Sequence, residues 1–238
     1  MFASHRLLSL PIVLALAGVA GCGGGAETNG LERASAADVQ QKAAAALKSA
    51  TSVHVRGTSV VDGVTARFDV RIEGASSTGS LTVDGTRVEI TNLPDAAYVK
   101  AGAAGLKAIG APPALQRAGA GRWLKLDPRD LTTLEGFSAA ELAAQLTTYE
   151  SPPEPEVKQV TRAGDRVVVL TMRDRSKLYV ANTGAAYPLH GDYGQPGPAR
   201  VDFTEYGVHF AIAAPAGAVG VEEAVKQSPA PAARAQAT

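Results

Sequence analysis

The apolar residues of this chain follow two different periods. From residue 39 to residue 50 they recur every three or four positions, which places them on one face of a helix. Ser35 and Asp38 stand just before this face in the S-x-x-D pattern that caps a helix N-terminus. Ser138 and Glu141 repeat that pattern before a shorter apolar segment. The sequence therefore predicts two capped helices.

Most of the remaining pattern alternates at every second residue. Residues 64–72 read V-T-A-R-F-D-V-R-I, which indicates a strand with one buried and one wet face. Asp62-Gly63 and Asp84-Gly85 predict hairpins, because both residue types tolerate the positive φ of a type I′ turn. We count about ten strands and two to four helices with short connections. The predicted fold class is α+β with a mainly antiparallel sheet.

The N-terminus has a different pattern. Residues 7–20 are almost wholly apolar and follow Arg6, but about 14 residues are fewer than the roughly 20 that a membrane span needs. A basic head and a short apolar segment are typical of a secretory signal peptide. The segment ends in Val19-Ala20-Gly21-Cys22, which resembles the lipobox of bacterial lipoproteins. The resemblance implies cleavage before Cys22 and lipid on its sulfur; a plain secretory signal is the alternative.

Cys22 is the only cysteine of the chain, so no internal disulfide can form. A free thiol outside the cell is open to oxidation, whereas a lipidated thioether is not. Two or three acyl chains, palmitate among them, would hold the protein stably, because one chain alone binds only weakly. We expect a protein anchored to the outer face of the cell membrane.

The chain divides into four predicted parts. Residues 1–21 form the signal peptide, and residues 22–34 form the lipidated cysteine with a flexible tether that lacks any apolar period. Residues 35–225 form one domain. Residues 226–238 are rich in proline and alanine and are predicted to be a disordered tail.

Composition excludes several classes of function. Lys+Arg and Asp+Glu both total 23, and a net charge of zero argues against nucleic acid or a strongly anionic surface as the main partner. No second apolar run is long enough to span a membrane. Aromatic residues make up only 5% of the chain, so small aliphatic side chains would line much of any cavity.

Candidate catalytic groups are few. The sequence has no H-E-x-x-H, no cluster of cysteine and histidine and no G-x-S-x-G, so we predict no catalytic residue, metal ligand or cofactor. His54 and His209 lie within strand patterns. His190 stands near Asp192 and is the basis of an alternative hypothesis, an enzyme that uses this pair.

A helical segment broken by glycine and proline separates two groups of strands. Its apolar residues Leu106, Ile109 and Leu115 either form a lid over an apolar pocket or pack as ordinary core. Trp123 follows in a short strand beside Arg122. It either lines the mouth of a cavity or fills the core from a half-buried position.

The order of these elements resembles a known group. The local similarities are diffuse and comprise Ala97-Tyr98-Val99-Lys100, Gly121-Arg122-Trp123-Leu124-Lys125, Leu178-Tyr179-Val180 with Tyr187-Pro188-Leu189, and Val201-Asp202-Phe203-Thr204-Glu205-Tyr206-Gly207. With the lipobox, they are similar to the LppX/LprA/LprF/LprG lipoproteins of actinobacteria, whose fold is similar to that of the LolA/LolB carriers. The resemblance implies a strongly curved antiparallel sheet, a half-barrel with helices packed over its concave face and an apolar cavity between them.

Two functions follow from this interpretation. The first is a monomeric, non-enzymatic binder or carrier of an acylated lipid or glycolipid at the cell envelope, which the resemblance implies. The alternative is a protein-interaction module in envelope assembly or signalling, in which an exposed sheet edge or loop makes the contact. A cavity between sheet and helices would favour the first hypothesis.

Overall fold

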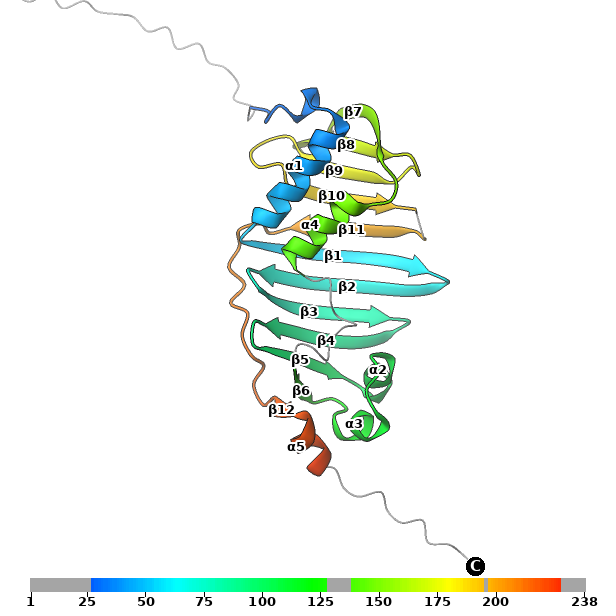
Figure 1. Cartoon of the computed structure of the whole chain (residues 1–238), viewed down its shortest axis with the longest axis vertical. Helices are drawn as coiled ribbons and strands as arrows, with labels where there is room; N and C mark the ends of the chain where they lie inside the picture. The colour runs from blue at the N-terminus through cyan, green and yellow to red at the C-terminus, as the bar shows by residue number, and fades with distance from the viewer. Residues whose placement is uncertain (1–26, 128–137, 195–196, 228–238) are drawn as a thin grey trace, which may run out of the picture.

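The computed structural model describes residues 27–127, 138–194 and 197–227. In these ranges one sheet of twelve strands is flanked by short helices, as Figure 1 shows. The strands are β1 (Ser52–Val61), β2 (Val64–Glu73), β3 (Ser76–Val83), β4 (Thr86–Leu93), β5 (Ala96–Ala101), β6 (Trp123–Leu126), β7 (Pro153–Arg162), β8 (Asp165–Met172), β9 (Lys177–Ala181), β10 (Pro188–Tyr193), β11 (Ala199–Thr204) and β12 (Val219–Gly220). The helices are η1 (Leu31–Arg33), α1 (Ala36–Ser49), α2 (Ala103–Ala108), α3 (Pro113–Ala118), α4 (Ala139–Thr148) and α5 (Val221–Lys226).

The strand order is β12-β6-β5-β4-β3-β2-β1-β11-β10-β9-β8-β7. All neighbours are antiparallel except β12 and β6, which pair in parallel over two residues. The sheet therefore consists of two meanders, β1 to β6 and β7 to β11, and the pairing of β1 with β11 joins them. The predicted α+β class with a mainly antiparallel sheet is confirmed.

The predicted strong curvature is wrong. The sheet is open, with β12 and β7 at opposite ends, and it has twelve described strands where the sequence predicted about ten. Bulges are a main cause of bending in sheets, and the described ladders from β1 to β5 run without any register shift. Register shifts occur only in the other half, between β9 and β10 and between β7 and β8.

Both predicted helix caps are present. The Ser35 hydroxyl accepts a hydrogen bond from the Asp38 backbone N–H at 3.1 Å and begins α1. Ser138 and Glu141 form the reciprocal capping box that begins α4. The two helices pack against each other over the β7 to β11 half of the sheet, while α2 lies at β4 and β5 and α3 packs against α2 and α5 (Figure 1).

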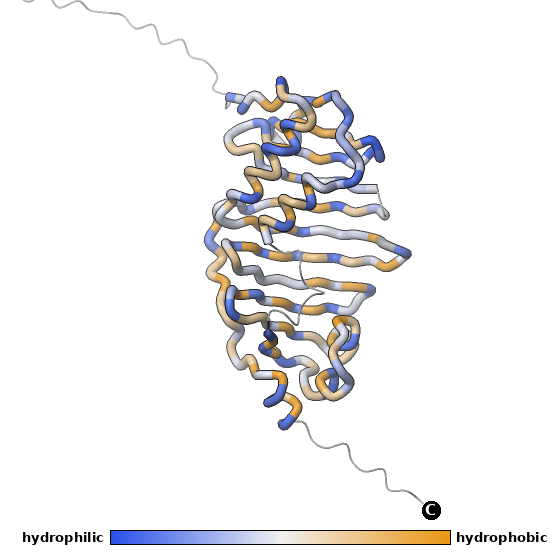
Figure 2. The backbone as a smooth tube through the Cα atoms, in the orientation of Figure 1, coloured by the Kyte–Doolittle hydropathy of each residue, from blue (hydrophilic) through white to orange (hydrophobic). Residues whose placement is uncertain are grey.

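The two predicted hairpin turns are confirmed. Asp62 and Gly63 have φ of 52° and 79°, and Asp84 and Gly85 have φ of 46° and 78°, as a type I′ turn requires. Hydrophobic and hydrophilic residues alternate along the paired strands (Figure 2), so each strand presents one face to the helices and one away from them.

Two separate cores stabilise the fold. The larger lies beneath α1 and α4 and includes Val39, Leu47, Val55 and Phe203. The smaller lies beneath α2 and α3 and includes Ile90 and buried residues of β5 and β6. Each helix pair therefore covers its own part of the sheet.

The folded part begins before Ser35. Asn29 donates its side-chain amide to the carbonyl of Ala181 at 3.0 Å, and Leu31 in η1 is buried at 1% exposure. Residues 29–34, which the sequence placed in a flexible tether, therefore pack against the domain. No helix among the described residues is long and apolar enough to cross a membrane.

Candidate functional site

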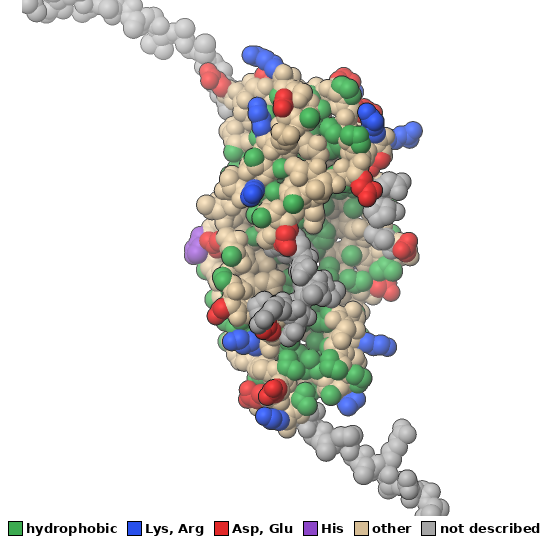
Figure 3. All heavy atoms as spheres, in the orientation of Figure 1, with side chains coloured by type: hydrophobic (Ala, Val, Ile, Leu, Met, Phe, Trp, Pro, Cys, Tyr) green, Lys and Arg blue, Asp and Glu red, His purple; other side chains and the backbone are tan. Residues whose placement is uncertain are grey.

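An apolar cavity of about 290 Å³ lies between the sheet and α4. Both meanders contribute to its wall, and the lining residues are Ser59, Phe68, Leu142, Gln145, Leu146, Tyr149, Met172, Leu178, Tyr193, Ala199, Val201 and Phe203. In Figure 3, hydrophobic side chains gather in the hollow between α4 and the helices α2 and α3. The cavity can accept a slender apolar group, because it is at the lower end of the about 300–1,000 Å³ of small-molecule sites.

Two glycines allow aromatic rings to form the wall of this cavity. A Cβ at Gly57 would lie 2.6 Å from Cε1 of Phe68, whose ring crosses from the paired strand. A Cβ at Gly191 would lie 2.7 Å from the hydroxyl of Tyr193. Because neither glycine has a side chain, both rings lie close to the sheet and leave the space above them open.

One end of the cavity is polar. The Tyr149 hydroxyl donates to Asp174 at 2.6 Å and lies 2.8 Å from the Ser176 hydroxyl, and its ring centroid is 5.4 Å from that of Tyr193. Burial, with smaller contributions from Tyr149 and Asp192, raises the pKa of Tyr193 to about 12. Its phenol is therefore neutral at physiological pH and can donate a hydrogen bond.

An open groove continues from this polar end. It has a volume of about 840 Å³ and is lined by Gln145, Thr148, Tyr149, Glu150, Ser151, Pro152 and Asp174. Gln145 and Tyr149 belong to both the cavity and the groove. The described residues of the lining carry carboxylates, hydroxyls and an amide, and none of them is basic. A chain in the cavity would therefore emerge beside groups suited to a polar head without negative charge.

His54 lies on the opposite face of the sheet. Its side chain has 0% exposure, and its Nε2 lies 2.6 Å from Asp69 while its Nδ1 lies 3.1 Å from Glu205. Burial raises the pKa of Asp69, but the hydrogen bond and charge of His54 outweigh burial, so the pKa is lowered overall. This arrangement fixes the chain after β11 to the sheet. It leaves His54 no open side for a substrate.

His190 has a similar environment. Its Nδ1 lies 2.6 Å from Asp202, and its Nε2 lies 3.0 Å from Asp192 without the geometry of a hydrogen bond. Tyr179 covers the ring at 5.3 Å between centroids, and only 4% of the side chain is exposed. The predicted pair of His190 and Asp192 is thus brought together, but a substrate cannot reach the buried imidazole. Among the described residues, no group of three or more His, Cys, Asp or Glu is arranged to hold a metal ion.

The residues predicted to form a cavity or lid lie elsewhere. Leu106 and Leu115 are buried at 1% and 6% exposure in the smaller core, and Ile109 packs against it. Trp123 pairs with Lys100 on the face away from the helices, where the Lys100 ammonium lies 5.9 Å from its ring. None of the four lines the 290 Å³ cavity. Cys22 and the lipobox residues Val19, Ala20 and Gly21 lie outside the described residues.

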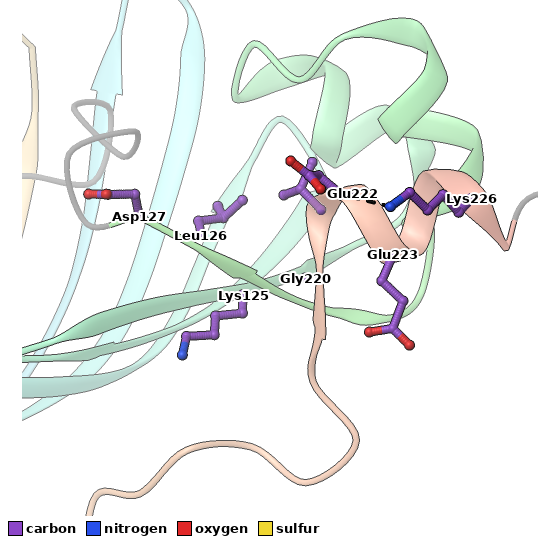
Figure 4. A pocket seen from close by; sticks show the side chains of 8 residues that line it. Lys125, Leu126, Asp127, Gly220, Glu222, Glu223 and Lys226 are labelled. Carbon is purple, nitrogen blue, oxygen red and sulfur yellow. Dashed lines mark ion pairs between the residues drawn. The ribbon is translucent and has the colours of Figure 1, made fainter.

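A further pocket of about 500 Å³ lies at the β6 edge (Figure 4). Its lining has three acidic and two basic side chains, and Glu222 and Lys226 approach to 4.0 Å. Because the charges largely balance and the site is open, it indicates no ligand class.

Sequence reasoning missed the residues that form the cavity. Phe68, Val201 and Phe203 do alternate with polar neighbours, so their strands and faces were predictable. Their meeting was not, because it depends on the pairing of β1 with β11 and on the position of α4. The one local signal for the cavity was Gly57, which the predicted hairpin at Asp62-Gly63 places opposite Phe68.

Comparison with known proteins supports the fold. No protein-family profile matches the sequence, and no curated protein is similar to it. LprF from Mycobacterium bovis superposes with a TM-score of 0.53 at 14% identity, over 76% of this chain and 97% of LprF. The fold is that of LprF. Lipoprotein LppX from Mycobacterium tuberculosis superposes with a TM-score of 0.46 at 16% identity, over 75% of this chain and 98% of LppX.

The MucA/MucB complex of Pseudomonas aeruginosa gives a TM-score of 0.36 at 18% identity, over 74% of this chain and 58% of the matched chain. At these identities the likeness to LprF shows the fold and not the ligand. The structural resemblance expected from the sequence is confirmed at the level of the fold by LprF.

Proposed function

We propose that this chain is a non-enzymatic envelope lipoprotein that binds the acyl chain of a lipid or glycolipid in the cavity beneath α4. The observation that carries the proposal is the cavity itself, with apolar walls from both meanders and one polar end. Each methylene that leaves water contributes about 0.8 kcal/mol, so about eight buried methylenes would contribute roughly 6 kcal/mol before the cost of association.

The adjoining groove would hold the polar head of the same ligand. Its hydroxyl, amide and carboxylate groups suit a hydroxyl-rich or otherwise uncharged head, whereas an anionic head would meet Glu150 and Asp174. The LprF-like fold agrees with this proposal, and so does the lipobox ending at Cys22, which would place the protein on the outer face of the cell membrane, where such lipids reside.

The test compares three forms of the full chain purified without added lipid from an actinobacterial host. Native mass spectrometry and solvent extraction would measure any co-purifying acylated species. Val201→Trp fills the cavity, and Thr204→Trp adds the same ring on the exposed face of the same strand as a control. We expect lipid with the parent chain and with Thr204→Trp, but not with Val201→Trp.

Equal lipid content in all three forms would show that the lipid is not in this cavity. Parent protein without lipid, and without uptake of added fatty acids or glycolipids, would overturn the proposal. Such a result would favour a protein-interaction module instead, for which the ten-residue edge strand β7 is the available surface.

Anchoring is tested separately through Cys22. Cys22→Ser removes the sulfur that would carry lipid. In cells given radiolabelled palmitate, we expect label on the parent chain and none on Cys22→Ser. Label on neither chain would overturn the anchor while leaving the cavity proposal intact.

A further inference from the structure

The sheet ends at β7, and no strand among the described residues pairs with its outer edge (Figure 1). Five consecutive residues of this strand, 158–162, are exposed. An unpaired edge presents a row of backbone N–H and C=O groups to which another strand can bind. The edge of β7 is therefore a candidate interface for a further strand.

The register of β7 with β8 determines which backbone groups face this edge. Arg162 and Asp165 close a two-residue turn whose central residues both have positive φ. The closing pair of such a turn exchanges backbone hydrogen bonds, so every second residue of β7, counted back from Arg162, bonds to β8. The start of the strand follows the same alternation, because the Arg173 N–H donates to the Pro152 carbonyl at 3.1 Å.

The residues between these positions direct their N–H and C=O groups to the free edge. They are Val157, Gln159 and Thr161. Pro153 and Pro155 lack an N–H, so the first part of the strand cannot donate to a neighbour. The part of the edge that can both donate and accept is therefore centred on Gln159.

The charged residues of β7 are arranged in the order that suits a second copy of the same strand. Two acidic residues, Glu154 and Glu156, come first, and two basic residues, Lys158 and Arg162, follow. An antiparallel copy would bring the acidic part of one strand opposite the basic part of the other. The strand is thus complementary in charge to itself.

One register pairs all three outward residues with outward residues. When Gln159 lies opposite Gln159 of the other copy, Val157 lies opposite Thr161 on both sides of the centre. Antiparallel pairs of this kind exchange two hydrogen bonds each, so the interface would contain about six. This register therefore uses the whole available edge.

The charges favour the same register. It places Glu156 of one copy opposite Arg162 of the other, and Lys158 opposite Val160. A shift by two residues would instead place Lys158 opposite Lys158 or opposite Arg162, and like charges directly opposite each other destabilise a strand pair. Backbone groups and side chains thus select one arrangement.

The side chains that would form this interface are accessible. Glu156 contacts Lys158 on its own strand at 3.6 Å, but their side chains are 71% and 61% exposed, and such a pair contributes little stability. Arg162 is exposed, although its guanidinium lies over the Tyr179 ring at 4.7 Å. Val160 is 40% exposed and would be covered by the Lys158 stem of the second copy.

We propose that β7 pairs antiparallel with β7 of a second copy about a two-fold axis through Gln159, so that two sheets become one. A dimer would replace the monomer that the sequence predicted. The axis is normal to the sheet, so η1 and α1 of both copies lie on the same face, as two anchors in one membrane require.

The inference rests on the proposed function only for the anchor at Cys22 and does not depend on a ligand in the cavity. Pairing of two edges buries little area, so we expect a weak dimer in solution. Anchoring in one membrane would raise the effective concentration of the copies and favour the dimer.

The test is oxidative cross-linking of the full chain in the envelope of an actinobacterial host. Gln159→Cys places two thiols opposite each other, with Cα atoms about 5.5 Å apart, which is within reach of a disulfide. Thr161→Cys places a thiol on the same edge, but its two copies would have Cα atoms about 14 Å apart. We expect at least about tenfold more covalent dimer from Gln159→Cys.

Charge variants test the register. Added to Gln159→Cys, Glu156→Arg should lower the yield of dimer several-fold, because like charges then lie opposite each other. Further addition of Arg162→Glu should restore the yield. Glu222→Arg on α5 is the matched control, since Glu222 is also exposed and approaches a lysine of its own element, and it should change nothing.

The proposal is overturned if Gln159→Cys gives no dimer, if Thr161→Cys gives as much, or if Glu156→Arg has no effect. A cross-link of Gln159→Cys to a different protein in place of the dimer would also overturn it. The parent chain controls for Cys22, because a covalent dimer of the parent would reveal a free thiol and so contradict the anchor. The comparison is then made with Cys22→Ser in every chain in concentrated solution, which separates failure of the anchor from failure of the dimer.

Discussion

The phenyl ring of Phe68 lies across the backbone of Gly57 on the neighbouring strand, in the space that a side chain at position 57 would occupy. Phe68 lines the cavity, so Gly57 determines how far that ring extends into it. The same Cβ would also lie 2.7 Å from the carbonyl oxygen of Arg200 on the other side. Position 57 therefore connects the shape of the cavity to the junction between the two meanders.

Gly57→Ala should destabilise the fold by about 1–3 kcal/mol, because the added methyl displaces the Phe68 ring and crowds the Arg200 carbonyl. Chemical denaturation would measure the free energy of unfolding. In the double variant Gly57→Ala/Phe68→Leu the cost should fall but not vanish, since the backbone contact remains. An unchanged free energy of unfolding in Gly57→Ala would contradict the arrangement.

Affinity for fatty acids should rise with chain length and then level off. Each added methylene should strengthen binding about fourfold, from about 0.8 kcal/mol of burial, until the 290 Å³ cavity is full. Calorimetry with a series of saturated chains would find the length at which the gain stops. Leu146→Ala, which enlarges the cavity, should move that length upward. A gain that continues without limit would indicate adsorption to the surface.

Comparing Leu106→Ala with Leu146→Ala distinguishes a loss of core packing from a change in the lipid cavity. Both remove a buried leucine, at 1% and 8% exposure, and each should cost about 2–5 kcal/mol in the free energy of unfolding. Only Leu146 lines the cavity, so only its replacement should change lipid binding at a temperature where both variants are folded. Loss of binding in Leu106→Ala would instead support the lid that the sequence suggested.

Acid should weaken the protein partly through Asp69. Its folded-state pKa is lowered, so its contribution to stability is complete above the ordinary carboxyl pKa of about 4 and is lost as the pH falls through the folded value. Asp69→Asn should therefore lower the free energy of unfolding at pH 6 and flatten its decline toward pH 3. Glu154→Gln, on the edge strand β7, is the control and should leave the decline unchanged. If the free energy of unfolding of Asp69→Asn fell with pH as steeply as that of the parent chain, Asp69 would not contribute to the acid sensitivity.

Local signals predicted the local structure well. The caps at Ser35 and Ser138 and the Asp-Gly turns depend on residues within four positions of each other, so the sequence determines them directly. The arrangement that forms the site depends on contacts between residues far apart in the sequence. The pairing of His54 with Thr204 joins residues 150 positions apart, and no periodicity encodes such a partner.

The curvature of the sheet and the role of Leu106 and Leu115 were also hard to predict from the sequence, because both depend on tertiary contacts. The half-barrel came from resemblance, while the flatness of β1 to β5 follows from a regular register that only the paired strands reveal. Leu106 and Leu115 had helical spacing compatible with either a lid or a core. Their burial against β5 and β6 depends on the tertiary position of α2 and α3.

The pairing of β1 with β11 has a consequence for how the chain matures. Each meander is made of short-range hairpins, whereas this single pairing must wait until the last strands have been made. Each meander can thus form from its own hairpins before the pairing of β1 with β11 joins the two halves. The cavity spans the junction of β1 and β11, with Ser59 and Phe68 from the first meander and Val201 and Phe203 from the second. A lipid bound there would contact both meanders and stabilise their association. Ligand binding would therefore be coupled to the last step of folding.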